Sequence, residues 1–333
     1  MLKIELHITK ALLVVVLLMG LSFTVHSQMV SQYTMWNQNH YLINPAAAGN
    51  LNYSDVNLGY RQQWTGVKHA PRTFYATYHS VLNKPRTYQR SALRISSSSS
   101  IRGYNKRTRR PTIKHALGGT LNNNEFGAFK NSSIYLSYAF HLPVYKDLML
   151  SFGASGGLSS YGFDESRALA AESNDPIFDA YVTGENSNKI NANSGIYLYS
   201  ERFFVGYSGF QLLQNKLEIA DIKTNSKETN LKVHHFLVGG YNFDLTNDFR
   251  LTPAVMLKKL NPNPLSFDFT TTLTYRQEIY MGLGYRGEDA VSVMLGMQLN
   301  HFMKVGYSYD YTLSELSERS TGSHELFIGM TLF

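Results

Sequence analysis

The residues best suited to chemistry lie close to the C-terminus, where two carboxylates and a histidine fall on neighbouring segments. Asp310, His324 and Glu325 lie near one another across the last predicted hairpin, and serines are abundant around them. A serine, a histidine and an acid together could form the triad of a hydrolase. No serine stands in a recognisable nucleophile context, and alternation puts both carboxylates on one polar face. We therefore expect a buried network with Arg61 or Lys304, because charges inside a protein need partners.

A glycine pattern of the GxGxxG type runs from Gly282 to Gly287. A dinucleotide site needs this motif to leave a strand and open a helix, so that the helix N-terminus meets the pyrophosphate. Here another strand is predicted to follow, and Gly282 and Gly284 fall on the small-residue face of their own strand. The pattern therefore predicts no bound cofactor.

Two adjacent histidines, His234 and His235, raise the question of a metal site. Neighbouring side chains on a strand point to opposite faces, so these two rings cannot chelate one ion. The chain has no HExxH spacing and no cysteine, which excludes a thiolate site and a disulfide framework. The sequence predicts neither a metal ion nor a cofactor.

The segments that hold these residues alternate with a period of two throughout residues 273–333. One face carries large apolar side chains: Ile279, Met281, Leu283, Tyr285, Val291, Val293, Leu295, Met297, Leu299, Met303, Val305, Tyr307, Tyr309, Tyr311, Leu326, Ile328, Met330 and Leu332. The other face is small or polar. This period predicts strands, with one face suited to lipid and the other to a lumen. Strands of about ten residues with aromatic ends are typical of a transmembrane β-barrel.

The same alternation recurs along most of the chain. It predicts strands at 54–63, 72–83, 114–122, 131–142, 147–160, 192–200, 202–212, 231–243, 249–260, 265–275, 278–286, 290–300, 302–312 and 324–333. The number is even, as bacterial barrels prefer. The predicted fold is therefore all-β, an antiparallel up-and-down barrel of about fourteen strands and of the outer-membrane type.

The N-terminus has the composition of a secretory signal peptide. Lys3 and Lys10 precede an almost unbroken apolar run over residues 11–25, and Ser27 offers a small residue for cleavage. The run is shorter than a membrane-spanning helix requires. We expect residues 1–27 to be removed after Ser27 and the protein to be exported to the bacterial outer membrane.

Residues 28–52 show no sustained period and end on Asn-Pro and Ala-Gly pairs, which punctuate irregular chain. We expect an ordered N-terminal segment that lies at or in the barrel mouth. The barrel domain is then residues 53–333.

Positive charge is concentrated in one segment. Residues 84–114 contain ten Lys and Arg residues and no Asp or Glu, whereas the whole chain carries only +7, so the rest is slightly acidic. A nucleic-acid partner is therefore not expected. The basic insert, residues 84–113, should be solvated, and Arg107, Arg109 and Arg110 are candidates for electrostatic contacts.

The lengths of the connections suggest the orientation of the barrel. After even-numbered strands they are short: 143–146, 201, 244–248, 276–277 and 301. After odd-numbered strands most are long: 65–71, 161–191, 213–230 and 313–323. Because outer-membrane barrels have short periplasmic turns and long outer loops, both termini should be periplasmic. The basic insert is the exception, a long connection on the periplasmic side.

Several stretches resemble the PorP/SprF family of type IX secretion system outer-membrane proteins from gliding and related bacteria. They are residues 31–33, 41–46 and 48–49, then 60–66 with 70–73, and finally 306–312 with 322–325. The motif residues with a structural or partner-binding role would be Asn44, Pro45, Gly49, Tyr60, Arg61, Trp64, Pro71, Asp310, His324 and Glu325. The basic insert is longer and more basic than the family pattern.

The resemblance implies a non-enzymatic outer-membrane component. Such a protein assists secretion or surface anchoring of exported proteins such as adhesins, and it connects to periplasmic parts of the machinery. The expected partners are outer-membrane lipid, an adhesin-like type IX cargo and periplasmic machinery, with no nucleic acid, small-molecule substrate or cofactor. A diffusion porin is the alternative from another class, and an outer-membrane hydrolase is a third.

Overall fold

The computed structural model describes residues 31–51, 53–82, 112–168, 187–215, 231–260, 264–287, 289–300 and 302–332. The predicted signal peptide and most of the basic insert, including Arg107, Arg109 and Arg110, lie outside these residues. Parts of the predicted outer loops 161–191 and 213–230, namely 169–186 and 216–230, do so as well.

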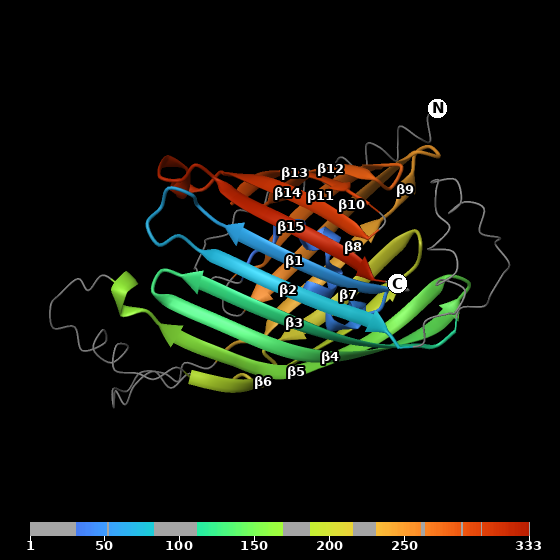
Figure 1. Cartoon of the computed structure of the whole chain (residues 1–333), viewed down its shortest axis with the longest axis horizontal. Coiled ribbons are helices and arrows are strands. Elements are labelled where there is room, and N and C mark those ends of the chain that lie inside the picture. Colours follow the sequence, from blue (N-terminus) through green and yellow to red (C-terminus); the bar gives the residue numbers. More distant parts are fainter. Residues whose placement is uncertain are drawn as a thin grey trace.

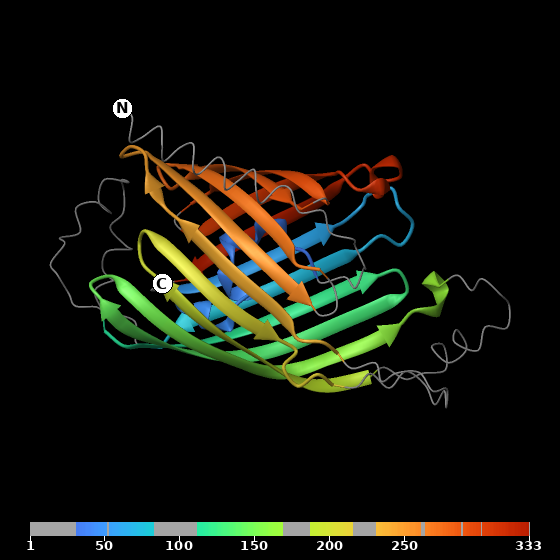
Figure 2. The ribbon, with the colours of Figure 1, turned by 180° about the vertical axis from the view of Figure 1, so that it is seen from behind.

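The described residues form one closed antiparallel sheet (Figure 1, Figure 2). Its strands are β1 (Ser54–Gln62), β2 (Arg72–Val81), β3 (Lys114–Phe126), β4 (Phe129–Tyr145), β5 (Leu148–Phe163), β6 (Ser187–Tyr199), β7 (Phe203–Phe210), β8 (His234–Tyr241), β9 (Phe243–Asp244), β10 (Phe249–Leu260), β11 (Ser266–Tyr275), β12 (Ile279–Arg286), β13 (Ala290–Gln298), β14 (Met303–Thr312) and β15 (Ser323–Leu332). β15 pairs with β1 and closes the barrel. β8 and β9 both pair with β10 along one line, so the barrel has fourteen strands, as predicted.

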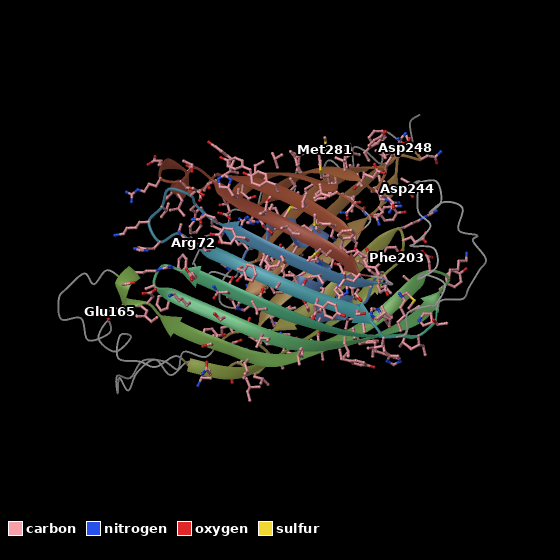
Figure 3. The ribbon with its side chains drawn as sticks, viewed as in Figure 1. Arg72, Glu165, Phe203, Asp244, Asp248 and Met281 are labelled. Atoms are coloured by element: carbon pink, nitrogen blue, oxygen red, sulfur yellow. The ribbon has the colours of Figure 1, made fainter. Side chains whose placement is uncertain are left out.

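Along the strands, most large apolar side chains point outward, whereas the inner face carries small and polar residues together with a set of buried aromatic and apolar ones such as Tyr75, Phe236 and Phe327. Along β12, Met281 and Leu283 are 54% and 63% exposed, whereas Gly282 and Gly284 are buried. Figure 3 shows Met281 on the outer surface of the sheet. Because side chains of one parity share one face of a strand, the predicted lipid and lumen faces are confirmed.

The two ends of the barrel differ. The long-loop end carries the connections 63–71 and 313–322, and the short-turn end carries turns such as 146–147, 200–202 and 276–278. In Figure 3, Arg72 and Glu165 lie at the long-loop end, and Asp244 and Asp248 lie at the other. β2 ends and β3 begins at the short-turn end, so the basic insert connects strands there.

Several strand boundaries differ from the prediction. The segment 123–130 was expected to connect two strands, but β3 and β4 continue through it and leave only Gly127 and Ala128 as the turn. Asn122–Asn124 have low strand propensity, but each pairs in register with β4, and cross-strand pairing overrides local preference. Gly127 has φ +58°, a conformation that glycine adopts without strain.

The predicted eighth strand, 231–243, is shorter and interrupted. It begins at His234 and breaks at Asn242, which separates β8 from β9. There the backbone N–H of Asn242 donates to the carbonyl of Arg202, and its side-chain amide donates to the carbonyl of Glu201. Asn242 therefore bonds to the β6–β7 turn, which interrupts the strand.

The N-terminal segment, residues 31–51, lies inside the barrel. It forms three short 3₁₀ turns: η1 (Thr34–Gln38), η2 (His40–Leu42) and η3 (Pro45–Ala47). Met35, Ala46 and Ala47 are completely buried, and Trp36 is 1% exposed. The segment is visible in blue behind the strands (Figure 1). We refer to residues 31–51 below as the plug.

Two further helical elements lie within the described residues, and both are single turns. They are η5 (Glu165–Arg167) and η6 (Glu315–Glu318), both at the long-loop end. No helix within the described ranges is both long and apolar enough to cross a membrane.

Candidate functional site

Six buried charges gather on the inner face of the barrel near its long-loop end, and we call them the ion-pair cluster. They are Arg61 on β1, Lys258 on β10, Asp268 on β11, Arg286 on β12, Asp310 on β14 and Glu325 on β15. Each is at most 7% exposed. Because three cations face three anions, the cluster is formally neutral, which is what burial of charge requires.

Arg61 joins the two carboxylates that the sequence singled out. Its Nη2 lies 2.6 Å from Oδ2 of Asp310, and its Nη1 lies 3.4 Å from Oε2 of Glu325. All three side chains point inward because they occupy the lumen parity of β1, β14 and β15. The predicted inward orientation of both carboxylates beside a cation is confirmed.

Arg286 extends the cluster to the neighbouring strands. Its Nη1 lies 3.3 Å from Oδ2 of Asp310, and its Nε lies 3.3 Å from Oδ1 of Asp268. Lys258 completes the chain of charges, with its Nζ 2.9 Å from Oδ2 of Asp268. The cluster therefore cross-links strands on both sides of β13.

The plug enters the ion-pair cluster through Thr34. The hydroxyl of Thr34 donates to Oδ2 of Asp310 at 2.8 Å, and it accepts from Nη1 of Arg61 at 2.8 Å. Nη2 of Arg286 also donates to this hydroxyl, at 3.2 Å. One threonine side chain thus lies between two guanidinium groups and a carboxylate, so its position is fixed by hydrogen bonds to charged groups, which are the stronger kind.

Glu325 caps the first turn of the plug. Its Oε2 accepts from the backbone N–H of Thr34 at 2.7 Å, and its Oε1 accepts from that of Met35 at 3.4 Å. The hydroxyl of Tyr75 on β2 donates to Oε1 at 3.0 Å. A carboxylate at a helix N-terminus satisfies N–H groups that have no partner in the helix. Here a barrel strand provides that carboxylate.

Further along, Asn44 attaches the plug to the wall between β6 and β7. Its side-chain amide donates to the backbone carbonyls of Ile196 and Tyr207, and its Oδ1 accepts from the N–H of Ala46. A Cβ at Gly195 would lie 2.1 Å from this Oδ1. Glycine is therefore needed at that position for the plug to approach the wall.

The plug ends at the short-turn end against β2, β3 and β4. His141 bonds through Nε2 to the carbonyl of Ala48, and Gly49 donates its N–H to Nδ1 of His79. Gly49 has φ +76°, and a Cβ there would lie 2.3 Å from that of Ala116. Glycine at this position thus has a steric reason.

The other predicted site residues lie outside the ion-pair cluster. Tyr60 faces outward and is 45% exposed. Trp64 follows β1 with φ 45° and donates its backbone N–H to Oγ of Ser323. Pro71 accepts from the N–H of Gln63 at 2.9 Å. Pro45 is the first residue of η3. These residues shape the ends of β1, β2 and η3.

His324 lies on the opposite face from the two carboxylates. Its Nδ1 is 2.6 Å from the hydroxyl of Tyr307, a pair on the outside of the barrel. Adjacent strand positions alternate, so His324 points away from the face that Asp310 and Glu325 share. The three residues considered for a hydrolase are therefore not brought together.

The other candidate motifs carry no ligand geometry either. Gly282 and Gly284 lie within β12, and β13 follows the turn at Gly287 where a dinucleotide site needs a helix. His235 pairs with the outward-facing Tyr207, whereas His234 lines the interior. Within the described residues, no group of three potential metal-ligating side chains occurs.

Sequence reasoning missed half of the ion-pair cluster. Lys304 was considered as the partner of the carboxylates, but its Nζ lies 5.3 Å from the ring centre of Phe327. Arg286 contacts Asp310 instead. The available signal was parity, because Arg286, Asp268 and Lys258 occupy inward positions on neighbouring strands. The contact of Thr34 with the cluster could not be predicted, because the local sequence of the plug does not indicate which strands it packs against.

A family profile described as type IX secretion system membrane protein PorP/SprF matches residues 25–330. No curated protein matches the chain. Similar solved structures include Omp33 of Acinetobacter baumannii (9% identity, 84% of this chain and 98% of that one, TM-score 0.43). They also include the toluene transporter TbuX of Ralstonia pickettii (9% identity, 87% and 92%, TM-score 0.47). A FadL homologue of Pseudomonas aeruginosa is similar as well (8% identity, 86% and 91%, TM-score 0.45).

Proposed function

The chain belongs to the PorP/SprF family of type IX secretion system membrane proteins, and from this premise we propose that it assists secretion or surface anchoring of exported proteins. Adhesin-like proteins are the expected cargo. The protein would act in the outer membrane as a scaffold and not as an enzyme. The observation that carries this proposal is the plug, which occupies the lumen and is fixed there by the ion-pair cluster.

An occupied lumen suits a scaffold better than a pore. A barrel of this size has room for a channel unless something fills it. Met35, Trp36 and Ala46–Ala48 occupy part of it here and are at most 1% exposed. A diffusion porin, the alternative function, would need this volume for solutes, so the plug favours a role in which the barrel surface or mouth binds a protein.

The contact surface for an exported protein would be at the long-loop end. Long outer loops carry the binding functions of outer-membrane barrels. We place the contact on the two connections predicted at 161–191 and 213–230, the first of which β5 and β6 shorten to 164–186, together with the barrel mouth. One of these loops connects β5 to β6, and the other connects β7 to β8.

The periplasmic contact would be made by the basic insert. β2 and β3 present this insert at the short-turn end, which corresponds to the periplasmic side of such barrels. Arg107, Arg109 and Arg110 would bind an acidic surface of the periplasmic machinery, and the contact should weaken with salt. Neutralising the three arginines should leave the barrel assembled and loosen this association. Labelling of Ser98 from outside intact cells would refute the periplasmic placement.

Deletion of the protein tests the leading function. The expected result is loss of cargo from the cell surface, with cargo co-purifying with the wild-type chain from solubilised outer membrane and identified by mass spectrometry. Complementation with the full-length chain is the control. Normal cargo display in the deletion strain would overturn the proposal, and a high conductance of the purified protein would favour the porin.

A further inference from the structure

A cavity of about 330 Å³ lies inside the barrel, between the plug and the wall formed by β3–β8 and the end of β10. Ser31, Tyr33, Leu42 and Ile43 form its plug side. Thr34 of the same segment bonds into the ion-pair cluster, so the cavity and the cluster share the plug as a common boundary. Its volume falls within the range of small-molecule sites, roughly 300–1,000 Å³.

The wall of this cavity is rich in amides and hydroxyls. β3 to β5 contribute the inward side chains Asn122, Asn124, Asn131, Ser133, Tyr135 and Tyr161. Hydrogen bonds order parts of this wall. The hydroxyls of Tyr135 and Ser159 are 2.6 Å apart, and Asn193 donates to Oγ of Ser155. Amides and hydroxyls both donate and accept hydrogen bonds, so this wall suits a ligand with many polar groups of both kinds.

Several polar atoms of the wall lack a partner within the described part of the chain. They are Oδ1 of Asn122, Asn124 and Asn131 and Oε1 of Gln211. All four side chains line the cavity. Asn124 and Asn131 are directly paired across β3 and β4, so their side chains are neighbours. Buried polar groups normally have partners. These oxygens are almost inaccessible as placed, so a ligand in the cavity would supply their partners once the amides rotate toward it.

The charged and aromatic residues that line the cavity restrict the class of ligand that it can bind. No carboxylate lines the cavity, and of its two basic groups, Lys232 and His234, the lysine is exposed to solvent, where its charge is screened. Phe210 and Phe236 pack edge to face beside the polar wall and offer flat apolar surface. A combination of flat aromatic faces with neutral hydrogen-bonding groups matches a ring that carries C–H surface and hydroxyls.

We infer that this cavity binds a short uncharged saccharide. Its hydroxyls would bond to the amides of Asn122, Asn124 and Asn131 and to the hydroxyl of Tyr161, and its ring would pack against the aromatic side. This ligand departs from the expectation of no small-molecule partner. It does not rest on the proposed secretion function, since it follows from the cavity alone.

An extended peptide fits the cavity less well. Peptides often bind by adding a strand to a free sheet edge. β3, β4 and β5, which supply most of the polar wall, are each paired on both sides. Their backbone groups are therefore taken, and recognition is left to side chains.

Calorimetric titration of the full mature chain tests this inference. The protein is held in an amine-oxide detergent, because alkyl glycosides would compete for the site. The probes are cellobiose and N,N′-diacetylchitobiose, with sialyllactose as a charged saccharide and an uncharged Gly-Ser peptide for comparison. We expect at least one neutral disaccharide to bind with a Kd of about 1 mM or tighter.

A matched pair of variants locates the binding. Asn124→Ala with Asn131→Ala removes the neighbouring amides and should weaken binding at least about tenfold. Asn123→Ala is the control, because Asn123 lies between two cavity residues on β3 but bonds Ser132 on the outer face. It should bind as the wild type does. Heat-modifiable migration in gels checks that each variant has folded.

Three results would overturn the inference. They are no binding of either neutral disaccharide by the wild type, unchanged affinity in the folded double variant, or preferred binding of sialyllactose or the peptide. Since these readouts do not involve cargo display, a failure here leaves the proposed function to its own test.

Discussion

At the residue scale, Arg61 contacts two carboxylates that come from different strands and one hydroxyl that comes from the plug. It is 1% exposed, so no solvent can replace these contacts. Removing one partner of a buried ion pair leaves the other charge without compensation, which costs far more than a surface pair contributes.

Arg61→Ala should therefore lower the free energy of unfolding by about 3–5 kcal/mol. Arg72→Ala is the matched control, because Arg72 lies at the exposed start of β2, and its effect should stay within about 0.5 kcal/mol. Urea unfolding in lipid vesicles measures both. Equal stabilities of the two variants would mean that the ion-pair cluster does not hold the barrel together.

A second residue-scale prediction concerns Asp164, at the rim beyond β5. A hydrogen bond from Lys130, at 2.7 Å, and one from Ser166 lower the pKa of this carboxyl to about 2. Because the folded pKa lies below the unfolded value of about 3.9, the stabilisation is full above that value and is lost as pH falls through about 2.

Carboxyl-carbon NMR titration checks this shift. Lys130→Met should move the pKa of Asp164 upward toward about 3.9, whereas Lys146→Met, at the opposite end of the barrel, should leave it unchanged. A wild-type pKa near the unfolded value would show that the Lys130 contact does not persist in solution.

At the element scale, the fit of the plug depends on small residues in the barrel wall. A Cβ at Gly153 on β5 would lie 2.3 Å from the backbone nitrogen of Ala46, whereas a Cβ at Gly156 meets nothing within 4 Å. The two glycines are on one strand but face opposite sides. Alanine at Gly156 therefore reports the effect of the substitution on the strand alone, whereas alanine at Gly153 adds the clash with the plug.

Gly153→Ala should displace η3 and expose it. The chain contains no cysteine, so Ala47→Cys provides a single buried probe for maleimide. Overpacking costs about 1–3 kcal/mol, so labelling should be roughly tenfold faster in the Gly153→Ala background. The Gly156→Ala background should label as slowly as the wild type. Equal rates in all three would contradict the close contact between η3 and β5.

At the scale of the whole molecule, a barrel of fourteen strands is too wide to be filled by its own side chains. Eight strands give an interior that side chains fill, and wider barrels enclose channels or additional segments. Here the N-terminal segment passes from the ion-pair cluster at the long-loop end to Gly49 near the short-turn end. The barrel and its plug therefore form one unit, with the plug covalently joined to β1.

Deleting residues 31–49 should open a conducting path. The full-length chain should show little current in planar bilayers, and the deletion variant should show stable channels. Thr34→Val is the substitute test if the deletion variant does not assemble. It removes the hydroxyl between Asp310 and Arg61 and should give intermittent channel openings. A large steady current through the full-length protein would contradict a filled lumen and would support the porin.

The sequence by itself determined the strands and their faces. Alternation is a local property of the chain, so the pattern around Met281 and Leu283 is sufficient to assign lipid and lumen sides. The same parity placed Asp310 and Glu325 inside. The predicted strand 249–260 coincides with β10. Both of its ends are apolar residues that adjoin polar ones, so the pattern marks where the strand begins and ends.

Only the tertiary structure decided what fills the lumen and which inward charges meet. The plug has no period, and its 3₁₀ turns are held by partners distant in sequence: Thr34 bonds Asp310, 276 positions further along. Such contacts exist only after β15 has paired with β1 and closed the barrel. The choice of Arg286 over Lys304 as the partner of Asp310 likewise depends on strand stagger around the closed sheet, which local alternation does not encode.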